Sequence, residues 1–151
     1  MDHLRVEKGH VVIGAEVDGR VTPADIGLGG MLRKQGGFVG WQGLQRPALA
    51  DPAGRRHLVG VAAVDGQALP EGAMLVAREG DVPLGHVTTA SPRVAPDPEG
   101  LTGGIGLALL TDGASRQGEE LLAWSATRGQ TVRVRVCEPV FYDREGARYR
   151  D

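Results

Sequence analysis

The sequence contains little of several kinds of residue, and each shortage excludes a class of protein. Cys137 is the only cysteine among 151 residues, so the chain cannot form an internal disulfide. This usage fits a reducing compartment, and we expect a cytoplasmic protein. The aromatic residues are 2 Trp, 2 Tyr and 2 Phe, or 4% of the chain. So few rings argue against the stacking platforms that hold single-stranded nucleic acid.

Long hydrophobic runs and a strong charge of either sign are also missing. No apolar stretch approaches the roughly 20 residues of a membrane-spanning helix, and the N-terminus lacks the basic and apolar regions of a secretory signal. The formal net charge is −2, so no overall field favours nucleic acid or an anionic membrane. We therefore expect neither as a partner. A length of 151 residues suits one domain, or one domain with a piece of another.

Glycine and proline, in contrast, are abundant, and short apolar runs lie between them. The 24 Gly and 9 Pro argue for strands joined by turns, because both residues destabilise the interior of a helix. In residues 131–136 three valines alternate with Arg133 and Arg135, which predicts a strand with one buried and one wet face. The longest loop is expected at residues 91–103. Six strands are expected in all, at residues 57–64, 73–77, 84–90, 105–110, 120–124 and 131–136. This pattern favours a sandwich, a jelly roll or a small barrel.

The first third of the chain is less regular. Residues 4–7 alternate between apolar and charged, which is typical of a half-buried strand or of the end of a helix. Thr22 followed by Pro23 indicates the start of a short helix. Residues 38–49 have the pattern of a short amphipathic helix that ends at Pro47 or at Asp51-Pro52. Residues 33–37 (Arg-Lys-Gln-Gly-Gly) break the pattern before it, so we place a boundary between two modules there.

The residues indicate neither a metal site nor a catalytic nucleophile. The four histidines include no pair at i, i+4 spacing, and Cys137 is distant from all of them in the sequence, so no metal is expected. No Gly-x-Ser-x-Gly elbow is present, and the glycine-rich residues 27–30 lack the Gly-Lys-Ser/Thr ending of a phosphate loop.

Arg5 is the most distinctive candidate for a binding residue. A guanidinium group suits bidentate binding of a carboxylate. The alternative is an internal ion pair with Glu7 or Asp18, and composition alone favours this alternative.

An ordered set of motifs resembles one family. Residues 4–9 (Leu-Arg-Val-Glu-Lys-Gly), 14–19 (Gly-Ala-Glu-Val-Asp-Gly) and 21–23 (Val-Thr-Pro) are similar to a stretch of the glycine-cleavage T proteins, or aminomethyltransferases. That stretch reads Leu-Arg-Leu-Glu-x-Gly, Gly-Gln-Asp-x-Asp and Thr-Pro. The carboxy-terminal half of the α subunit of heterotetrameric sarcosine oxidase is closer still, above all at residues 139–143 (Pro-Val-Phe-Tyr-Asp). The resemblance covers nearly the whole chain.

The resemblance implies a division of the chain and a fold. Residues 1–37 would be the end of the first, folate-binding lobe, and residues 38–151 the C-terminal β-barrel or jelly-roll lobe of the aminomethyltransferase fold. The predicted fold class is therefore mainly β, a six-stranded jelly-roll or barrel-like lobe with a short α+β N-terminal extension.

The resemblance also implies a cofactor and a binding residue. The family captures an aminomethyl one-carbon unit on tetrahydrofolate, and in sarcosine oxidase flavin and NAD are held by other parts of the complex. The arginine of Leu-Arg-Leu-Glu belongs to the folate site, which makes Arg5 a candidate folate contact and Glu7 a lesser one. The chain departs from the family at Ala15 and Glu16, which replace Gln-Asp, and at Trp41, which replaces a lysine.

The family's catalytic aspartate and most of its pterin pocket lie upstream of the segment that this chain matches. We therefore assign no catalytic residue and expect the isolated chain to be inactive. Its partners would be the missing lobes, other subunits of a sarcosine oxidase-like complex, or a second copy of the chain. Two alternatives stay open: a fragment of a glycine-cleavage T protein, and a non-catalytic β module that binds a protein partner.

Overall fold

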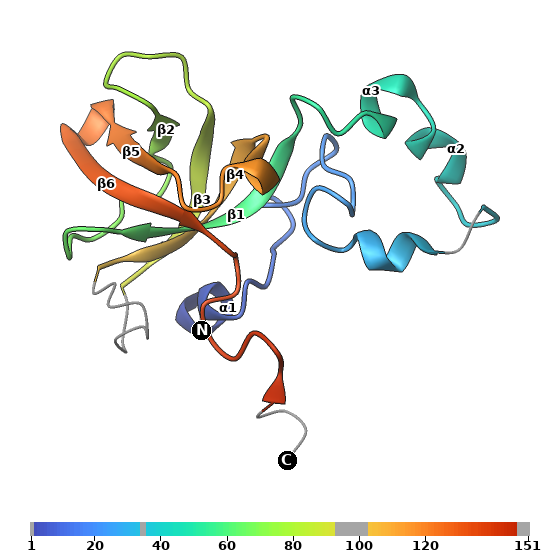
Figure 1. Ribbon diagram of the computed structural model, residues 1–151, viewed down its shortest axis with the longest axis horizontal. Coiled ribbons are helices and arrows are strands. Elements are labelled where there is room, and N and C mark those ends of the chain that lie inside the picture. Colours follow the sequence, from blue (N-terminus) through green and yellow to red (C-terminus); the bar gives the residue numbers. More distant parts are fainter. Residues whose placement is uncertain (1, 34–35, 93–102, 148–151) are drawn as a thin grey trace.

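The barrel of six strands organises the molecule (Figure 1). The computed structural model describes residues 2–33, 36–92 and 103–147. The six predicted strands are confirmed, with their ends shifted by at most one residue. They are β1 (Arg56–Ala63), β2 (Met74–Val76), β3 (Gly85–Ser91), β4 (Ile105–Thr111), β5 (Glu120–Ser125) and β6 (Gln130–Cys137).

The strands form a closed sheet in the order β1-β4-β3-β2-β5-β6. Every pairing is antiparallel, and β6 returns to β1 through the pairs from Gly60–Cys137 to Ala63–Val134. Closure gives each strand two neighbours, so the backbone donors and acceptors of its edges are paired. The predicted mainly β, barrel-like fold is confirmed. The proposed boundary before residue 38 stays a prediction.

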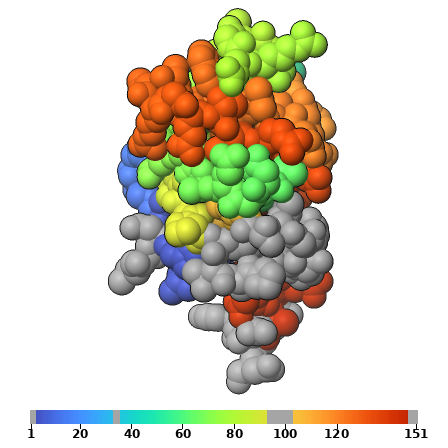
Figure 2. Space-filling model, turned by 90° about the vertical axis from the view of Figure 1, so that its left-hand side faces the viewer, coloured from blue at the N-terminus to red at the C-terminus, as the bar shows by residue number. Residues whose placement is uncertain are grey.

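The interior of the barrel is filled by small and branched apolar side chains. Alternate residues of each strand point inward, as the valines at 132, 134 and 136 of β6 do. These side chains have almost no exposed surface and pack into one cluster: Val59, Val61, Ala63, Leu69, Ala73, Leu75, Val87, Ala108, Leu110, Leu121, Ala123, Val132, Val134 and Val136. In Figure 2 the orange segment of β5 and β6 lies against the green segment that follows β1, where the Val64 amide donates to the Arg133 carbonyl at 3.0 Å.

The outer face of β1 and β4 is buried as well. A second, outer cluster covers this face. It contains Leu58 and Ala62 of β1, the odd-numbered residues 105–109 of β4, and Val6 of the helix α1 (Asp2–Glu7). The N-terminal segment that follows α1 runs alongside β1 (Figure 1) and adds Val11, Val21 and Ile26 to this cluster. Residues 2–26 therefore form the outer layer over one part of the barrel.

The helices are shorter than the sequence predicts. The helix expected at Thr22-Pro23 is wrong: residues 23–27 form turns, because Gly27 has a φ of +78° and interrupts the helical backbone, and a 3-10 helix (Gly29–Arg33) follows. The helix expected at residues 38–49 is not continuous, and it breaks at Pro47, which was one of its two predicted ends. It is divided into α2 (Trp41–Leu44) and α3 (Pro47–Ala50), because Arg46 precedes a proline and takes an extended conformation with ψ of 136°.

Two further 3-10 turns (Gly113–Ser115 and Ala126–Arg128) connect strands. The loop predicted at residues 91–103 lies almost wholly outside the described residues. Within residues 2–33, 36–92 and 103–147, no helix combines the length and the apolar content that crossing a membrane requires.

A matched pair of substitutions tests the importance of the barrel interior. Val132 has 0% exposed surface, whereas Val82 is 85% exposed. Replacement of Val132 by Ala should lower the free energy of unfolding by about 2 kcal/mol, because two buried methyl groups are lost and a cavity is left. Val82→Ala should change it by less than about 0.5 kcal/mol. Urea denaturation of the two variants measures the difference, and equal effects would contradict the assignment of the interior.

Candidate functional site

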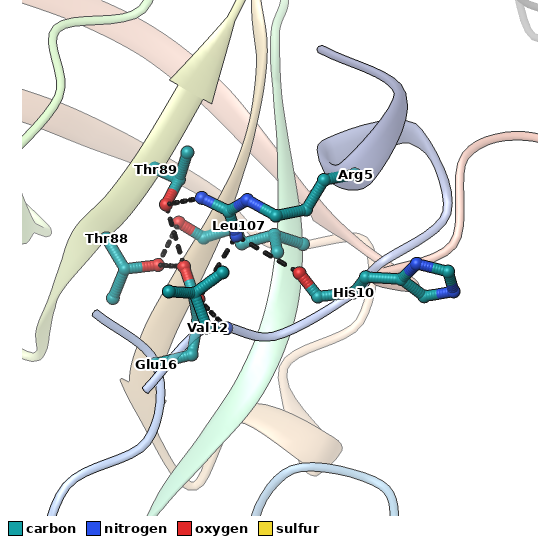
Figure 3. Close-up of polar contacts among 7 residues, drawn as sticks. All are labelled: Arg5, His10, Val12, Glu16, Thr88, Thr89 and Leu107. Atoms are coloured by element: carbon teal, nitrogen blue, oxygen red, sulfur yellow. Dashed lines mark hydrogen bonds and ion pairs between the residues drawn. The ribbon is translucent and has the colours of Figure 1, made fainter. Parts of the chain in front are cut away.

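A buried carboxylate joins the N-terminal segment to the barrel (Figure 3). Glu16 has 0% exposed surface. Its Oε2 accepts hydrogen bonds from the Val12 amide at 2.8 Å and from Nη1 of Arg5 at 3.2 Å. Its Oε1 accepts from the hydroxyls of Thr88 at 2.7 Å and Thr89 at 2.8 Å. A carboxylate can be buried when charge and hydrogen bonds compensate for its lost hydration, and here both oxygens are satisfied.

A β-bulge in β3 brings both threonines to the same carboxylate. Successive residues of a regular strand point to opposite faces. The register between β3 and β4 shifts between Val87 and Thr89, so one residue of β3 lacks a counterpart on β4. A bulge of this kind re-aims side chains, and Thr88 and Thr89 therefore reach Glu16 together. The Thr88 hydroxyl also lies 3.0 Å from the Leu107 carbonyl.

Arg5 completes the network from the last turn of α1. Its Nη1 donates to the His10 carbonyl at 3.0 Å as well as to Glu16, and its Nη2 donates to Thr89 Oγ1 at 2.8 Å. The sequence suggested Glu7 or Asp18 as a partner for Arg5, and the structure adds Glu16, which that reasoning had not considered. Asp18 binds Arg20: its Oδ2 accepts hydrogen bonds from Nε of Arg20 at 2.8 Å and from Nη2 at 2.6 Å.

The network keeps Glu16 ionised. Burial raises the pKa of the Glu16 carboxyl, but hydrogen bonds from Thr88, the Val12 amide and Thr89 and the charge of Arg5 outweigh burial and hold the pKa below its usual range. At neutral pH the site is therefore an ion pair enclosed by hydroxyl and amide donors.

Glu7, the lesser candidate from the sequence, lies where the two ends of the described chain meet. Its side chain is 18% exposed and lies 3.5 Å from Nε2 of His3. Its carbonyl accepts hydrogen bonds from the amides of Phe141 at 2.8 Å and Tyr142 at 3.0 Å. The motifs at residues 4–9 and 139–143, which are far apart in the sequence, are therefore in contact.

Lys8 and Gly9 extend this contact. Lys8 Nζ binds the Asp143 carboxylate at 3.2 Å and the Asp143 carbonyl at 3.1 Å. Gly9 has a φ of +66°, and a Cβ atom added there would lie 2.6 Å from the Pro139 carbonyl oxygen. The conformation and the close approach both require glycine at the end of the Leu-Arg-Val-Glu-Lys-Gly motif.

A second buried ion pair ties the following loop to the start of β1. Arg55 binds both carboxylate oxygens of Asp25, with Nε 2.9 Å from Oδ1 and Nη2 on Oδ2. Thr22 donates to Asp25 through its amide at 2.7 Å and its hydroxyl at 2.8 Å. Burial raises the pKa of Asp25, but the hydrogen bonds from Arg55 and Thr22 outweigh burial and lower it. Thr22 thus serves a local turn that the Asp25 carboxylate closes.

Sequence reasoning found Arg5 but missed most of what surrounds it. Glu16 appeared only as a departure from the Gln-Asp of the family motif, and Thr88 and Thr89 only as part of a strand. Two adjacent threonines within an apolar strand were the one available signal, because their hydroxyls need partners when buried. Among the described residues, no group of three His, Cys, Asp or Glu side chains could hold a metal ion.

Comparisons with known proteins agree with this architecture. The family described as "Glycine cleavage T-protein C-terminal barrel domain" matches residues 56–143. The chain is 40% identical to the sarcosine oxidase subunit alpha of Rhizobium meliloti (strain 1021) over 153 aligned residues, which cover 96% of this chain and 15% of that protein. The subunit alpha of Corynebacterium sp. (strain U-96) is also 40% identical and covers 98% of this chain.

Two aminomethyltransferases are similar in different ways. That of Streptomyces avermitilis is 38% identical over 94 residues, or 60% of this chain and 25% of that protein. The crystal structure of glycine cleavage system aminomethyltransferase T from Bartonella henselae superposes with a TM-score of 0.71 over 95% of this chain and 38% of that chain. At 22% identity this likeness shows the fold alone. The chain spans about 15% of the length of the sarcosine oxidase subunits that it matches.

Removal of the charge of Glu16 tests the network. In Glu16→Gln one carboxylate oxygen becomes an NH2 group, which cannot accept the two hydrogen bonds that this oxygen accepts. At pH 7 the free energy of unfolding should therefore fall by about 2 kcal/mol. Glu120→Gln is the matched control, because Glu120 forms an exposed pair with Arg135 at 3.0 Å, and it should cost less than about 1 kcal/mol. Urea denaturation measures both, and equal losses would contradict the role of Glu16.

The pH dependence of stability gives an independent test. The folded state lowers the pKa of Glu16 from its ordinary value of 4.5. Its stabilisation is therefore complete above that pH and is lost as the pH falls through the lower folded-state value. Below pH of about 4.5, wild-type stability should fall more steeply than that of Glu16→Gln. Because the folded state also lowers the pKa of Asp25, Asp25 makes stability fall with decreasing pH in the wild type and in Glu16→Gln alike. Identical slopes would exclude Glu16 as a contributor.

Proposed function

The chain belongs to the family of the glycine cleavage T-protein C-terminal barrel domain, and from this premise we propose that it is the C-terminal segment of a sarcosine oxidase α subunit-like protein. In the complete protein it would help to bind tetrahydrofolate for transfer of a one-carbon, aminomethyl-derived unit. The observation that carries the proposal is the extent of the likeness. The sarcosine oxidase subunits match 96% to 98% of the chain, which includes the N-terminal segment with Arg5 as well as the barrel.

The same observation ranks the alternative of a glycine-cleavage T protein second. The curated aminomethyltransferases match 60% of the chain, so the likeness to them is less extensive. Flavin and NAD would belong to other parts of a sarcosine oxidase-like complex, and none of the residues described above is assigned to them.

Arg5 is the proposed folate contact, with Glu7 as a lesser candidate. The support is the family resemblance together with the way in which the guanidinium is held. Glu16, Thr89 and the His10 carbonyl fix its two terminal nitrogens, yet 17% of its side chain stays exposed. A preorganised cation that is partly open to solvent suits the binding of an anionic or polar group.

The proposed partners are the lobes and subunits that complete the folate channel, or a second copy of the chain. The support is apolar surface on the N-terminal segment: Ile13 is 87% exposed and Leu4 is 66% exposed. Val11 of the same segment is not part of this surface, because it packs against the outer cluster of Leu58, Leu107 and Leu109. Exposed apolar side chains of this size are typical of surfaces that are covered in an assembly.

The proposed role of Arg5 is tested by calorimetric titration with tetrahydrofolate. Arg5→Ala should weaken binding by about tenfold, which corresponds to the loss of one hydrogen-bonded charge. Arg133→Ala, on the exposed face of β6, is the matched control. Glu16→Gln shows whether loosening of the N-terminal segment alone has the same effect. Equal saturable binding by wild type and Arg5→Ala would contradict the proposal, whereas no binding by either would place the pocket largely outside this chain.

The isolated chain is expected to have no turnover, because the resemblance places the catalytic aspartate and most of the pterin pocket upstream. Incubation with sarcosine, oxygen and tetrahydrofolate should give no methylenetetrahydrofolate above a control without protein, as measured by mass spectrometry. Product formation that Arg5→Ala abolishes would show instead that these 151 residues contain a complete active site.

A further inference from the structure

A cleft of about 520 Å³ opens on the outer face of the barrel, and neither Arg5 nor Glu16 is among the residues that line it. Two neighbouring strands contribute to its floor. Leu109 of β4 and His86 of β3 are direct neighbours in the sheet and both line the cleft, whereas Leu58 of β1, which pairs with Leu109, is buried in the outer cluster. Arg56 precedes Leu58 by two residues and therefore lies on the same face of β1. The loop from Gly14 to Val21 forms one wall.

The charges in the cleft do not cancel. Asp18 is bound by Arg20, and Arg55 is bound by Asp25, so these two arginines are neutralised locally. The exposed guanidinium of Arg56 has no hydrogen bond or ion pair with any residue in the part of the chain that the structure describes. One positive charge is therefore left over on a face that also carries an imidazole.

His86 lies within reach of the charges of the cleft. It is half-buried, and burial, followed by the charges of Arg56 and Arg20, lowers its pKa, while Asp18 opposes this effect. A second cleft of about 410 Å³ shares Gly14, Ala15 and His86 with the first. The charged residues that it adds are Glu71 and Arg128. His86 thus lies where the two clefts meet, and Arg56 and Arg20 of the first cleft add to the effect of burial on its pKa.

We propose that this cleft binds a small oxyanion, a carboxylate or a phosphate group, with Arg56 as the anchor and His86 as a second donor. A guanidinium presents parallel donors that match the oxygens of either group. The volume lies within the range of small-ligand sites, and the neighbouring cleft leaves room for the rest of an organic ligand. The site uses residues other than Arg5 and Glu16 and does not depend on the folate proposal.

The test is a titration of the intact chain followed by the NMR resonance of the His86 imidazole, which His86→Gln assigns. Inorganic phosphate and acetate are the probes, with sodium chloride at equal ionic strength as the reference. At least one probe should shift the resonance saturably and raise the midpoint pH of His86, because binding and protonation are linked reciprocally. Tighter binding of phosphate assigns a phosphate ligand, and tighter binding of acetate assigns a carboxylate.

Three variants make the test specific. Arg56→Gln should weaken binding of the preferred probe by about tenfold. Arg133→Gln, an exposed arginine on the outward face of β6, should leave the affinity unchanged. Asp18→Asn should increase the affinity, because it removes the negative charge that competes for the arginines. The absence of saturation with both probes, or the same affinity in Arg56→Gln as in wild type, would overturn the proposal.

Discussion

The buried carboxylate of Glu16 is the interaction on which the arrangement of the N-terminal segment depends. It joins three parts of the chain by polar contacts, in addition to the apolar packing of Val6 on the barrel: α1 through Arg5, the turn at Val12, and the bulge of β3. Breaking such a pair by removing one partner is costly, because the other is left buried and unsatisfied. Because the buried carboxylate needs these partners, the position of the segment on the barrel is specific. Within the described strands, Thr88 and Thr89 are the only two consecutive residues that carry hydroxyls.

This constraint explains why the barrel is buried on both faces along β1 and β4. A barrel of small and branched side chains fills its own interior, but the outward Leu58, Leu107 and Leu109 need a separate cover. The N-terminal segment provides this cover through Val6, Val11 and Val21, and the ion pair of Asp25 with Arg55 fixes its far end. Apolar contact supplies most of the stabilisation, whereas the two ion pairs determine the register of the contact.

The sequence predicts the barrel better than the site because the two depend on different information. Short apolar runs that stop at glycine, proline or aspartate turns are local signals, as is the alternation in residues 131–136, and together they located all six strands. The helix predictions were inaccurate where a single residue interrupts the helical backbone. Pro47 holds the preceding Arg46 in an extended conformation, and Gly27 has a positive φ. The Glu16 network was not predicted, because the bulge that brings Thr88 and Thr89 together is a property of the pairing of two strands, and the two threonines alone do not identify their partner. Arg5 was found through a motif, but its partner is fixed by the tertiary fold.

The separation in sequence between the contacting residues has a consequence for the order of assembly. Glu16 and Thr88 are 72 positions apart, and Lys8 and Asp143 are 135 positions apart. The two hydroxyls that receive Glu16 converge only after β3 has paired with β4 and formed its bulge, so the receptor for the carboxylate does not exist in a partly formed sheet. Contacts of this range close late and slow the folding of a domain. The N-terminal segment, which is synthesised before the barrel, is therefore the part that docks last, and until then Val6 and Val11 stay exposed to solvent.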